Sequence, residues 1–400
     1  MAQRKSARIG VLFTQFSAYH IDRCQAVAQR FAGTAEVLAV EVATSSTTYA
    51  WDASGAVSGA RKITLFPGMN YDQISWPRRF WRQFKALRRC ETVLIGIGYN
   101  ELDVIALSWL LTLLGTKVIL LSESKFDDKP RRIQTECVKA VALAPYRAAI
   151  VGGHRHIAYL RFLGFHRRPV MPGYDTVNLA RVRAMGGGAA APDGPAYAGR
   201  NFIFVGRFVD KKNLLETIAG FAIYAATAGP QARRLVLIGA GVEEPAMRAA
   251  AAAHGVSHLV DFPGFLGAEA VARALSGGLA LVLVSCEEQW GLVVNEALAF
   301  GLPAIISASV GSGDLLVRNL SNGYVIEQGS PQGLALAMAS LASDEALWRK
   351  MVAAAHARAW LGDTERLADA AEALIFPDRA NAADRVTEMQ QFLACPPAQH

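Results

Sequence analysis

The sequence predicts an α/β protein made of two Rossmann-like domains, each with a parallel sheet. Short apolar β-type runs alternate with helical stretches over residues 8–172, and a second alternating set runs from Asn201 to about residue 345. Alternation of this kind favours a parallel sheet with helices on both faces. The length of 400 residues also exceeds what one hydrophobic core usually supports.

The two sets are separated by a change of composition. Residues 186–200 are rich in Gly, Ala and Pro, which is typical of a linker. We therefore predict a first domain at residues 1–185, a linker at 186–200 and a second domain at 201–375. Two such domains form a cleft, and ligand sites concentrate in clefts between domains.

Seven short apolar runs are the expected strands of the first domain. The longest apolar stretch, Val104–Leu114, is about half as long as a bilayer span requires, so we expect a buried helix there. The expected strands are Ile9–Phe13, Glu36–Val42, Lys62–Leu65, Thr92–Gly96, Lys117–Leu121, Ala148–Val151 and Pro169–Met171.

The composition narrows the class of protein. Hydrophobic residues make up 52% and charged residues 19% of the chain, as in an ordinary globular protein. A net charge of +7 attracts anionic partners. The sequence shows no RNP, KH or helix-turn-helix pattern, so we prefer a nucleotide diphosphate and an anionic lipid surface to a specific nucleic acid.

Cysteine and histidine usage predicts reduced thiols and no metal site. No two cysteines form a CxxC pair, and no histidine pair has the context of a zinc site. The N-terminus carries no signal-peptide hydrophobic region, so we expect a cytoplasmic protein, possibly peripheral on the inner face of the plasma membrane. The five cysteines are Cys24, Cys90, Cys137, Cys286 and Cys395.

The most informative stretch is Ser285–Pro303, in which Glu288 and Glu296 stand eight residues apart with Gly291 between them. An apolar strand precedes the pair and a helical run follows it, so the junction lies at the ligand-binding end of a parallel strand. Gly291 lets the backbone approach a ligand. The first N–H groups of the helix can receive a phosphate, and the carboxylates can accept sugar hydroxyls. This pattern predicts a nucleotide-sugar site.

The same stretch resembles the donor site of retaining glycosyltransferases of family 4, with the pattern E-x-F/W-G-x-x-x-x-E-A-x-A-x-G-x-P. Other segments resemble further parts of that family in order and spacing: residues 204–213, 236–241, 260–265, 311–315 and 321–323, with 171–175 resembling the link between domains. The pattern itself is met by Glu288, Trp290, Gly291, Glu296, Ala297, Ala299, Gly301 and Pro303.

The resemblance implies a GT-B fold, with its two sheets facing across a cleft and a C-terminal helix, residues 376–400, that crosses back to the first domain. It also implies retaining transfer of a hexose from a nucleotide diphosphate sugar. Departure of the nucleotide builds negative charge on a phosphate, which fixed cations stabilise in the transition state. Arg207 and Lys212 are the cations that match. Asn213 stands where the family has a glycine.

The two carboxylates take different roles by the same resemblance. Glu296 holds the ribose hydroxyls, and Glu288 faces the donor hexose and steadies charge at the reacting sugar. Without the resemblance, each carboxylate can be explained by the helix dipole. Phe265 is a nucleobase contact or a core residue. The other donor-binding candidates of this domain are Gly206, Gly264, Trp290, Gly291, Leu292 and Val293.

The first domain departs from the family in two loops. The loop at residues 14–20 lacks the usual glycine pair, and within it Ser17 and His20 are candidate donor contacts. The loop at residues 122–128 lacks the usual histidine, and Glu123 is the candidate substitute. A carboxylate there can assist deprotonation of an acceptor hydroxyl. The alternative is a polar surface loop.

Residues 76–89 predict a basic amphipathic helix, with six basic residues, no acidic ones, and Phe80, Phe84 and Leu87 on one stripe. Such a helix can lie on an anionic bilayer. Packing of the stripe on the sheet with arginines outward is slightly preferred, because one stripe cannot serve both faces.

The sequence thus predicts a hexosyltransferase that uses a UDP- or GDP-sugar and needs no metal. The acceptor would be a saccharide, a lipid-linked or a small-molecule hydroxyl in bacterial polysaccharide or glycolipid assembly. One alternative is a nucleotide-sugar epimerase. Another is a catalytically silent relative that binds nucleotide sugar and scaffolds a biosynthetic complex. A dehydrogenase is disfavoured, because Gly239-Ala-Gly241 lacks the third glycine of the dinucleotide fingerprint.

Overall fold

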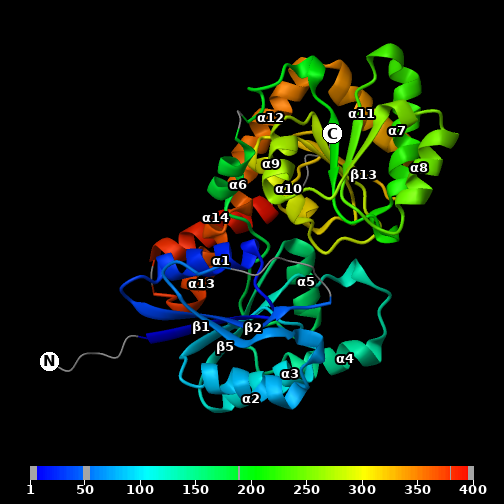
Figure 1. The fold of residues 1–400 in the computed structure, drawn as a ribbon. Helices are drawn as coiled ribbons and strands as arrows, with labels where there is room; N and C mark the ends of the chain where they lie inside the picture. Colours follow the sequence, from blue (N-terminus) through cyan, green and yellow to red (C-terminus); the bar gives the residue numbers. More distant parts are fainter. Residues whose placement is uncertain (1–6, 48–54, 188–189, 379, 395–400) are drawn as a thin grey trace. The chain divides into compact units, whose positions relative to one another are not determined.

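The computed structural model describes residues 7–47, 55–187, 190–378 and 380–394. The chain forms two compact units (Figure 1). The first contains the residues up to Asn178 together with Thr364–Ala394, and the second contains Leu179–Asp363. Each unit has one sheet in which all neighbouring strands are parallel. The prediction of two Rossmann-like domains with parallel sheets is confirmed.

The sheet of the first unit has seven strands in the order β3-β2-β1-β4-β5-β6-β7. Each predicted strand overlaps an observed one, because short runs rich in Val, Ile and Leu bounded by turns are reliable signals of buried strands. The strands are β1 (Ala7–Phe13), β2 (Ala35–Ser45), β3 (Arg61–Asn70), β4 (Thr92–Ile95), β5 (Lys117–Ser122), β6 (Ala148–Val151) and β7 (Val170–Pro172).

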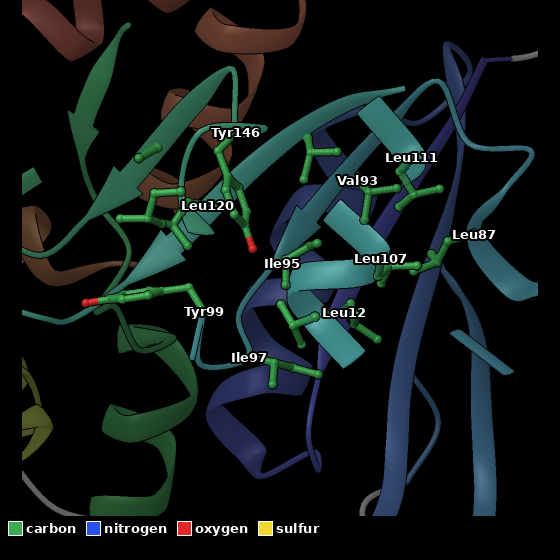
Figure 2. Packing of buried hydrophobic residues seen from close by; sticks show 14 of the residues in the cluster. Leu12, Leu87, Val93, Ile95, Ile97, Tyr99, Leu107, Leu111, Leu120 and Tyr146 are labelled. Carbon is green, nitrogen blue, oxygen red and sulfur yellow. The ribbon is translucent and has the colours of Figure 1, made fainter. Parts of the chain in front are cut away.

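Helices cover both faces of this sheet (Figure 1). Successive strand residues point to opposite faces, so Val11 belongs to the core under one layer of helices and Leu12 to the core under the other. Figure 2 shows Leu107 and Leu111 of one helix beside Val93 of β4. The helices on the Leu12 side include α2 (Trp76–Leu87), α3 (Leu102–Leu113), α4 (Ile133–Ala142) and α5 (His154–Phe162), and α1 (Ala18–Arg30) lies on the other side.

The sheet of the second unit has six strands in the order β10-β9-β8-β11-β12-β13. They are β8 (Phe202–Val205), β9 (Leu235–Ile238), β10 (Val260–Gly264), β11 (Ala280–Leu283), β12 (Ala304–Ser307) and β13 (Gly323–Ile326). Its helices are α6 (Leu179–Gly186), α7 (Leu214–Ala228), α8 (Glu244–Ala253), α9 (Ala268–Ser276), α10 (Leu292–Ala299), α11 (Pro331–Ser343) and α12 (Glu345–Ala359).

The chain returns to the first unit earlier than the predicted residue 376. Helix α13 (Glu365–Ile375) lies in that unit, where Leu367 and Leu374 join the core beside β1. Arg30 of α1 pairs with Asp369 at 2.5 Å and Glu372 at 3.0 Å. An apolar stripe and acidic partners for Arg30 therefore hold α13 there. Helix α14 (Ala380–Ala394) follows it, and residues 379 and 395–400 of the predicted segment, including Cys395, lie outside the described residues.

The predicted linker also differs from the structure. Most of residues 186–200 belong to the second unit, apart from residues 188 and 189, which lie outside the described part of the chain. The buried Arg200 donates to the carbonyls of Asp193 at 2.6 Å and Gly278 at 3.0 Å. The Ala191 N–H donates to the Phe300 carbonyl at 2.9 Å. Composition alone does not reveal these anchors.

Helix α3 was expected to be buried, and the structure buries only part of it. Its Val104, Leu107 and Leu111 are buried, whereas Trp109 is 41% and Leu113 77% exposed. Its inner face alone packs against the sheet and α2. No helix among the described residues combines the length and the apolar character that crossing a bilayer requires.

Candidate active site

The predicted site of the second unit lies where β8 and β11 end. These neighbouring strands are parallel, and the strand order turns in opposite directions on their two sides. Open α/β sheets bind ligands at such a switch point, outside the carboxyl ends of the strands. Gly206 and Arg207 follow β8, and the segment that contains Glu288 and Gly291 follows β11. The topology therefore brings together residues that are about 80 positions apart in the sequence.

Lys212 and Glu288 are in direct contact. The Lys212 Nζ donates to Glu288 Oε2 in an ion pair that is largely shielded from water. The Ser285 hydroxyl donates to the same carboxylate oxygen at 3.3 Å. The backbone N–H of Cys286 donates to the Lys211 carbonyl at 2.8 Å, which joins the two loops. The structure thus brings the predicted cation, Lys212, and the predicted carboxylate, Glu288, together.

The loop that carries Glu288 is also fixed from its other side. The Gly311 N–H donates to the Glu288 carbonyl at 3.1 Å, and the Ser312 N–H donates to the Trp290 carbonyl at 3.0 Å. The carboxylate is therefore held on a rigid backbone, which limits the reorganisation required when a charged ligand arrives.

The backbone conformation at Asn213 explains why the resembling family has a glycine at this position. Asn213 has φ 57° and ψ 42°, in the left-handed region, and is the residue before α7. Glycine adopts this conformation without strain, and asparagine is among the few other residues that visit it routinely. Its amide also donates to the Val284 carbonyl at 3.4 Å. The substitution therefore preserves the turn that places Lys212.

Gly291 directly precedes α10 and has φ 91°. A Cβ there would lie 2.9 Å from Leu283 Cδ2, so the position requires glycine for both conformation and space. Leu292 and Val293 are the first residues of the helix, whose N-terminal N–H groups favour anions. Glu296 is half-buried one turn further along the same helix.

Trp290 has a supporting role in this structure. Its side chain is 2% exposed, so the indole predicted to contact the donor lies inside the unit. The indole N–H donates to Asn295 Oδ1 at 2.9 Å, and the Asn295 amide donates to the Gly362 carbonyl at 3.1 Å. This chain of hydrogen bonds fixes the first turn of α10. The sequence pattern does not separate such a support from a ligand contact.

The glycines around β9 form a close backbone crossing. A Cβ on Gly239 would lie 1.9 Å from the Gly206 carbonyl oxygen, so the segment is a tight turn, as its incomplete fingerprint indicates. The Gly239 N–H donates to the Gly264 carbonyl at 3.0 Å. Phe265, which follows, is 81% exposed and is not a core residue. Arg207 is exposed at the end of β8.

In the first unit, Ser17 and His20 surround the start of α1. The His20 Nδ1 accepts from the Ser17 N–H at 3.1 Å and lies 2.9 Å from the Ser17 hydroxyl. Burial, together with the neighbouring Arg23, lowers the pKa of His20 to about 3. The imidazole is therefore neutral near pH 7, and both residues serve the N-terminus of the helix.

Glu123 is exposed directly after β5, and the buried Asp175 follows β7. Burial, and secondarily the charge of Glu123, raises the pKa of Asp175 well above its ordinary value, although Arg23 lies 3.7 Å from it. Strongly shifted carboxyl groups at a ligand-binding edge are candidate functional groups. The sequence interpretation missed Asp175, which it treated only as part of the link between domains. Its position just beyond a strand was the available signal.

Comparison with known proteins agrees with this geometry. Residues 197–358 match the model of a family described as glycosyl transferases group 1. Solved structures with the same fold include sucrose-phosphate synthase from Thermosynechococcus elongatus, with 19% identity, a TM-score of 0.70, and coverage of 94% of this chain and 100% of that one. Another is Anabaena HepE in complex with UDP, with 14% identity, a TM-score of 0.68, and coverage of 92% and 99%. The fold is therefore GT-B.

Two curated relatives match part of the chain with higher sequence identity. D-inositol 3-phosphate glycosyltransferase from Streptomyces griseus is 33% identical over 135 residues, which are 33% of this chain and 28% of that protein. 2-Deoxystreptamine N-acetyl-D-glucosaminyltransferase from Streptomyces fradiae is 28% identical over 159 residues, or 40% and 38% of the two chains. The matches thus span less than half of these relatives. Together with the family model, which covers the segment that holds the Lys212–Glu288 pair, they support the resemblance to group 1 glycosyltransferases.

Proposed function

We propose that this protein is a retaining glycosyltransferase that moves a hexose from a UDP- or GDP-sugar to a hydroxyl acceptor. The observation that carries the proposal is the Lys212–Glu288 pair at the switch point of a sheet, inside a segment that matches the family model. In the reaction the bond between the sugar C1 and the phosphate oxygen breaks, and its electron pair leaves with the nucleotide. The acceptor oxygen bonds to C1, and its proton is released.

The ion pair gives a physical route to this chemistry. Lys212 is bound to Glu288 in the present structure. A diphosphate at the N-terminus of α10 would compete for Lys212, because its charge is larger than that of one carboxylate. The released Glu288 would then face the hexose, where positive charge develops. Arg207 would complete the cationic side, and no metal would be required for the leaving group.

The remaining residues of the second unit would bind the donor. Glu296 would accept hydrogen bonds from the ribose diol, the backbone at Gly291, Leu292 and Val293 would receive a phosphate, and Gly264 with the exposed Phe265 would flank the base. The acceptor would be a saccharide or a lipid-linked or small-molecule hydroxyl in bacterial polysaccharide or glycolipid assembly. Structures of this fold that contain UDP with glucose or with GlcNAc support this class of ligands.

The test is slow donor hydrolysis without acceptor, measured with EDTA present across UDP-, GDP-, ADP- and dTDP-sugars. We expect turnover of one donor, and Lys212→Ala should lower it by roughly a hundredfold or more, the scale of losing one charge stabiliser. Lys211→Ala is the matched control, since the neighbouring lysine contributes its backbone carbonyl to the loop and should retain near-normal turnover.

Other outcomes separate the alternatives. Tight donor binding without turnover, even with acceptors added, would indicate a silent relative that acts as a scaffold. Conversion of one nucleotide sugar into its epimer without an acceptor would indicate an epimerase. If no nucleotide sugar binds, the proposal is wrong.

A further inference from the structure

Helix α2 presents two different faces, and its outer face has no assigned role. The inner face consists of Arg79, Gln83 and Leu87, which are buried. The predicted stripe of Phe80, Phe84 and Leu87 packs against the core of the sheet. This agrees with the preferred prediction that the stripe packs on the sheet. The outer face carries its own aromatic residues, because Trp76 is 46% and Trp81 is 56% exposed. One helix can therefore serve both the core and an external partner.

The outer face of α2 is strongly cationic. Its exposed basic residues recur at helical spacing on one side and continue past the end of the helix. Among the residues that the structure describes, none of them forms an ion pair with a carboxylate. No acidic residue lies between positions 74 and 90. These basic residues are Arg78, Arg82, Lys85, Arg88 and Arg89.

Two adjoining hollows in this surface share Lys85. One, of about 280 Å³, is lined by Phe66, Pro77, Arg78, Trp81 and Arg82 as well as Lys85. The other, of about 350 Å³, is lined by Arg61, Arg88 and Arg89 among others, with Glu36 as its acidic residue. The guanidinium carbons of Arg78 and Arg82 each lie 5.7 Å from the centroid of the Phe66 ring. The apolar floor of the first hollow, beside the mainly cationic lining of the second, suits an amphiphile that has an anionic head.

The neighbouring helix also exposes large apolar residues. Helices α2 and α3 lie side by side on the same face of the sheet (Figure 1). Helix α3 exposes Trp109 at 41% and Leu113 at 77%, and Leu114, the residue after it, is 58% exposed. Exposed clusters of large apolar residues mark contact surfaces in soluble proteins, and tryptophan with basic side chains is the combination favoured at bilayer interfaces.

We propose that the outer face of α2, together with the exposed end of α3, binds the surface of an anionic lipid bilayer. The charge argues against a second copy of the chain, because a symmetric contact would place the same cationic residues against each other. Lipid phosphates neutralise these charges, while Trp81 and the exposed leucines enter the interfacial region. This surface is separate from the Lys212–Glu288 site and does not depend on the proposed transfer reaction.

The test is co-sedimentation of the full chain with vesicles of phosphatidylcholine, with and without phosphatidylglycerol. We expect binding to the anionic vesicles only, weakening as salt is added. The double variant Arg82→Glu/Lys85→Glu should bind at least about 25-fold more weakly, since each basic residue near an anionic surface contributes roughly fivefold. Trp81→Ala should also weaken binding and reduce quenching of tryptophan fluorescence by brominated lipid.

The matched control is Arg161→Glu/Arg167→Glu, which changes the net charge equally at exposed positions of the same unit on other elements. It should bind like the wild type. Donor hydrolysis should be normal in both double variants, so that failure of the membrane proposal is distinguishable from failure of the proposed function. The proposal is overturned if the wild type ignores anionic vesicles at low salt, if both double variants lose binding equally, or if Arg82→Glu/Lys85→Glu instead dissociates a dimer in solution.

Discussion

At the residue scale, the backbone after β8 determines where Lys212 can reach. The lysine ends a 3₁₀ turn (Asp210–Lys212), and the left-handed Asn213 then precedes α7. The position of Lys212 thus depends on the left-handed backbone conformation of Asn213, which few residue types adopt. A substitution at Asn213 should therefore act on the stability of the turn and on the proposed donor site together.

We predict that Asn213→Gly is tolerated, whereas Asn213→Val destabilises the protein by about 1–2 kcal/mol, because a β-branched residue is strained in the left-handed region that asparagine tolerates. Urea unfolding would measure this difference. Donor hydrolysis should fall in the valine variant and persist in the glycine variant. Equal stability of the two variants would contradict the role assigned to the left-handed turn.

His20 gives a pH dependence of known sign. Its pKa is lowered to about 3 in the folded protein, against about 6.5 in an unfolded chain. The stabilisation from the neutral ring is therefore complete above pH 6.5 and is lost as the pH falls toward 3. Over this window the wild type should lose at most about 1.4 kcal/mol per pH unit relative to His20→Gln. Urea unfolding at several pH values would test this, and parallel pH profiles would contradict it.

The position of Glu288, Gly291 and Glu296 between β11 and β12 was predictable, because these residues occupy one short stretch between two apolar strands. The surroundings of Trp290 and Asp175 could not be predicted in this way. Trp290 is a core residue here because its indole finds Asn295 inside the unit, a contact that depends on tertiary structure. The pKa of Asp175 is raised because the side chain is buried and because Glu123 carries a like charge nearby. Neither the burial nor the proximity of Glu123 can be seen in the sequence around Asp175.

At the scale of elements, a buried polar network holds α2 on α3. Arg79 pairs with Asp103 at 2.7 Å and with Glu101 at 2.8 Å, and the Gln83 amide donates to Asp103 at 2.8 Å. The network neutralises the one arginine of α2 that faces inward. It therefore fixes the rotation of the helix and keeps the other basic residues on the outer face.

We predict that Asp103→Ala destabilises the protein by about 1–3 kcal/mol, because the buried Gln83 amide loses its acceptor and Arg79 keeps only the more exposed Glu101 as an ionic partner. Glu91→Ala, at an exposed position of the same unit, should stay within about 0.5 kcal/mol of the wild type. The double variant Arg79→Met/Asp103→Leu should lose less stability than Asp103→Ala alone. Thermal or urea unfolding measures all three, and a larger loss in the double variant would contradict the assignment.

The sequence predicted the strands better than the exposure of the helices. A buried parallel strand is apolar on both faces, so its signal is local. The apolar run of α3 indicates burial, but how much is covered depends on which neighbours pack there. Only the inner face is covered, and Trp109 and Leu113 remain exposed.

At the scale of the whole molecule, the first unit is discontinuous in the sequence. Its core beside β1 includes Leu367 and Leu374 of α13, and Lys117 of β5 donates to the Leu374 carbonyl at 2.5 Å. The sequence did not predict that the chain returns to the first unit at α13, because an apolar stripe can pack on the sheet of either unit. The contacts of α13 with Arg30 and Lys117 assign it to the first unit.

We therefore predict that ending the chain after Asp363 unfolds the first unit and spares the second. The missing α13 would uncover apolar residues of β1 and α1 and leave Arg30 without the buried Asp369 and Glu372. The truncated chain should bind a hydrophobic dye and lose one cooperative unfolding transition. The fragment Leu179–Asp363 is the control and should keep its own transition, because its sheet and helices are contiguous in sequence. A truncated chain that retains both transitions would show that α13 is dispensable, and the boundary at Thr364 would then have no energetic meaning.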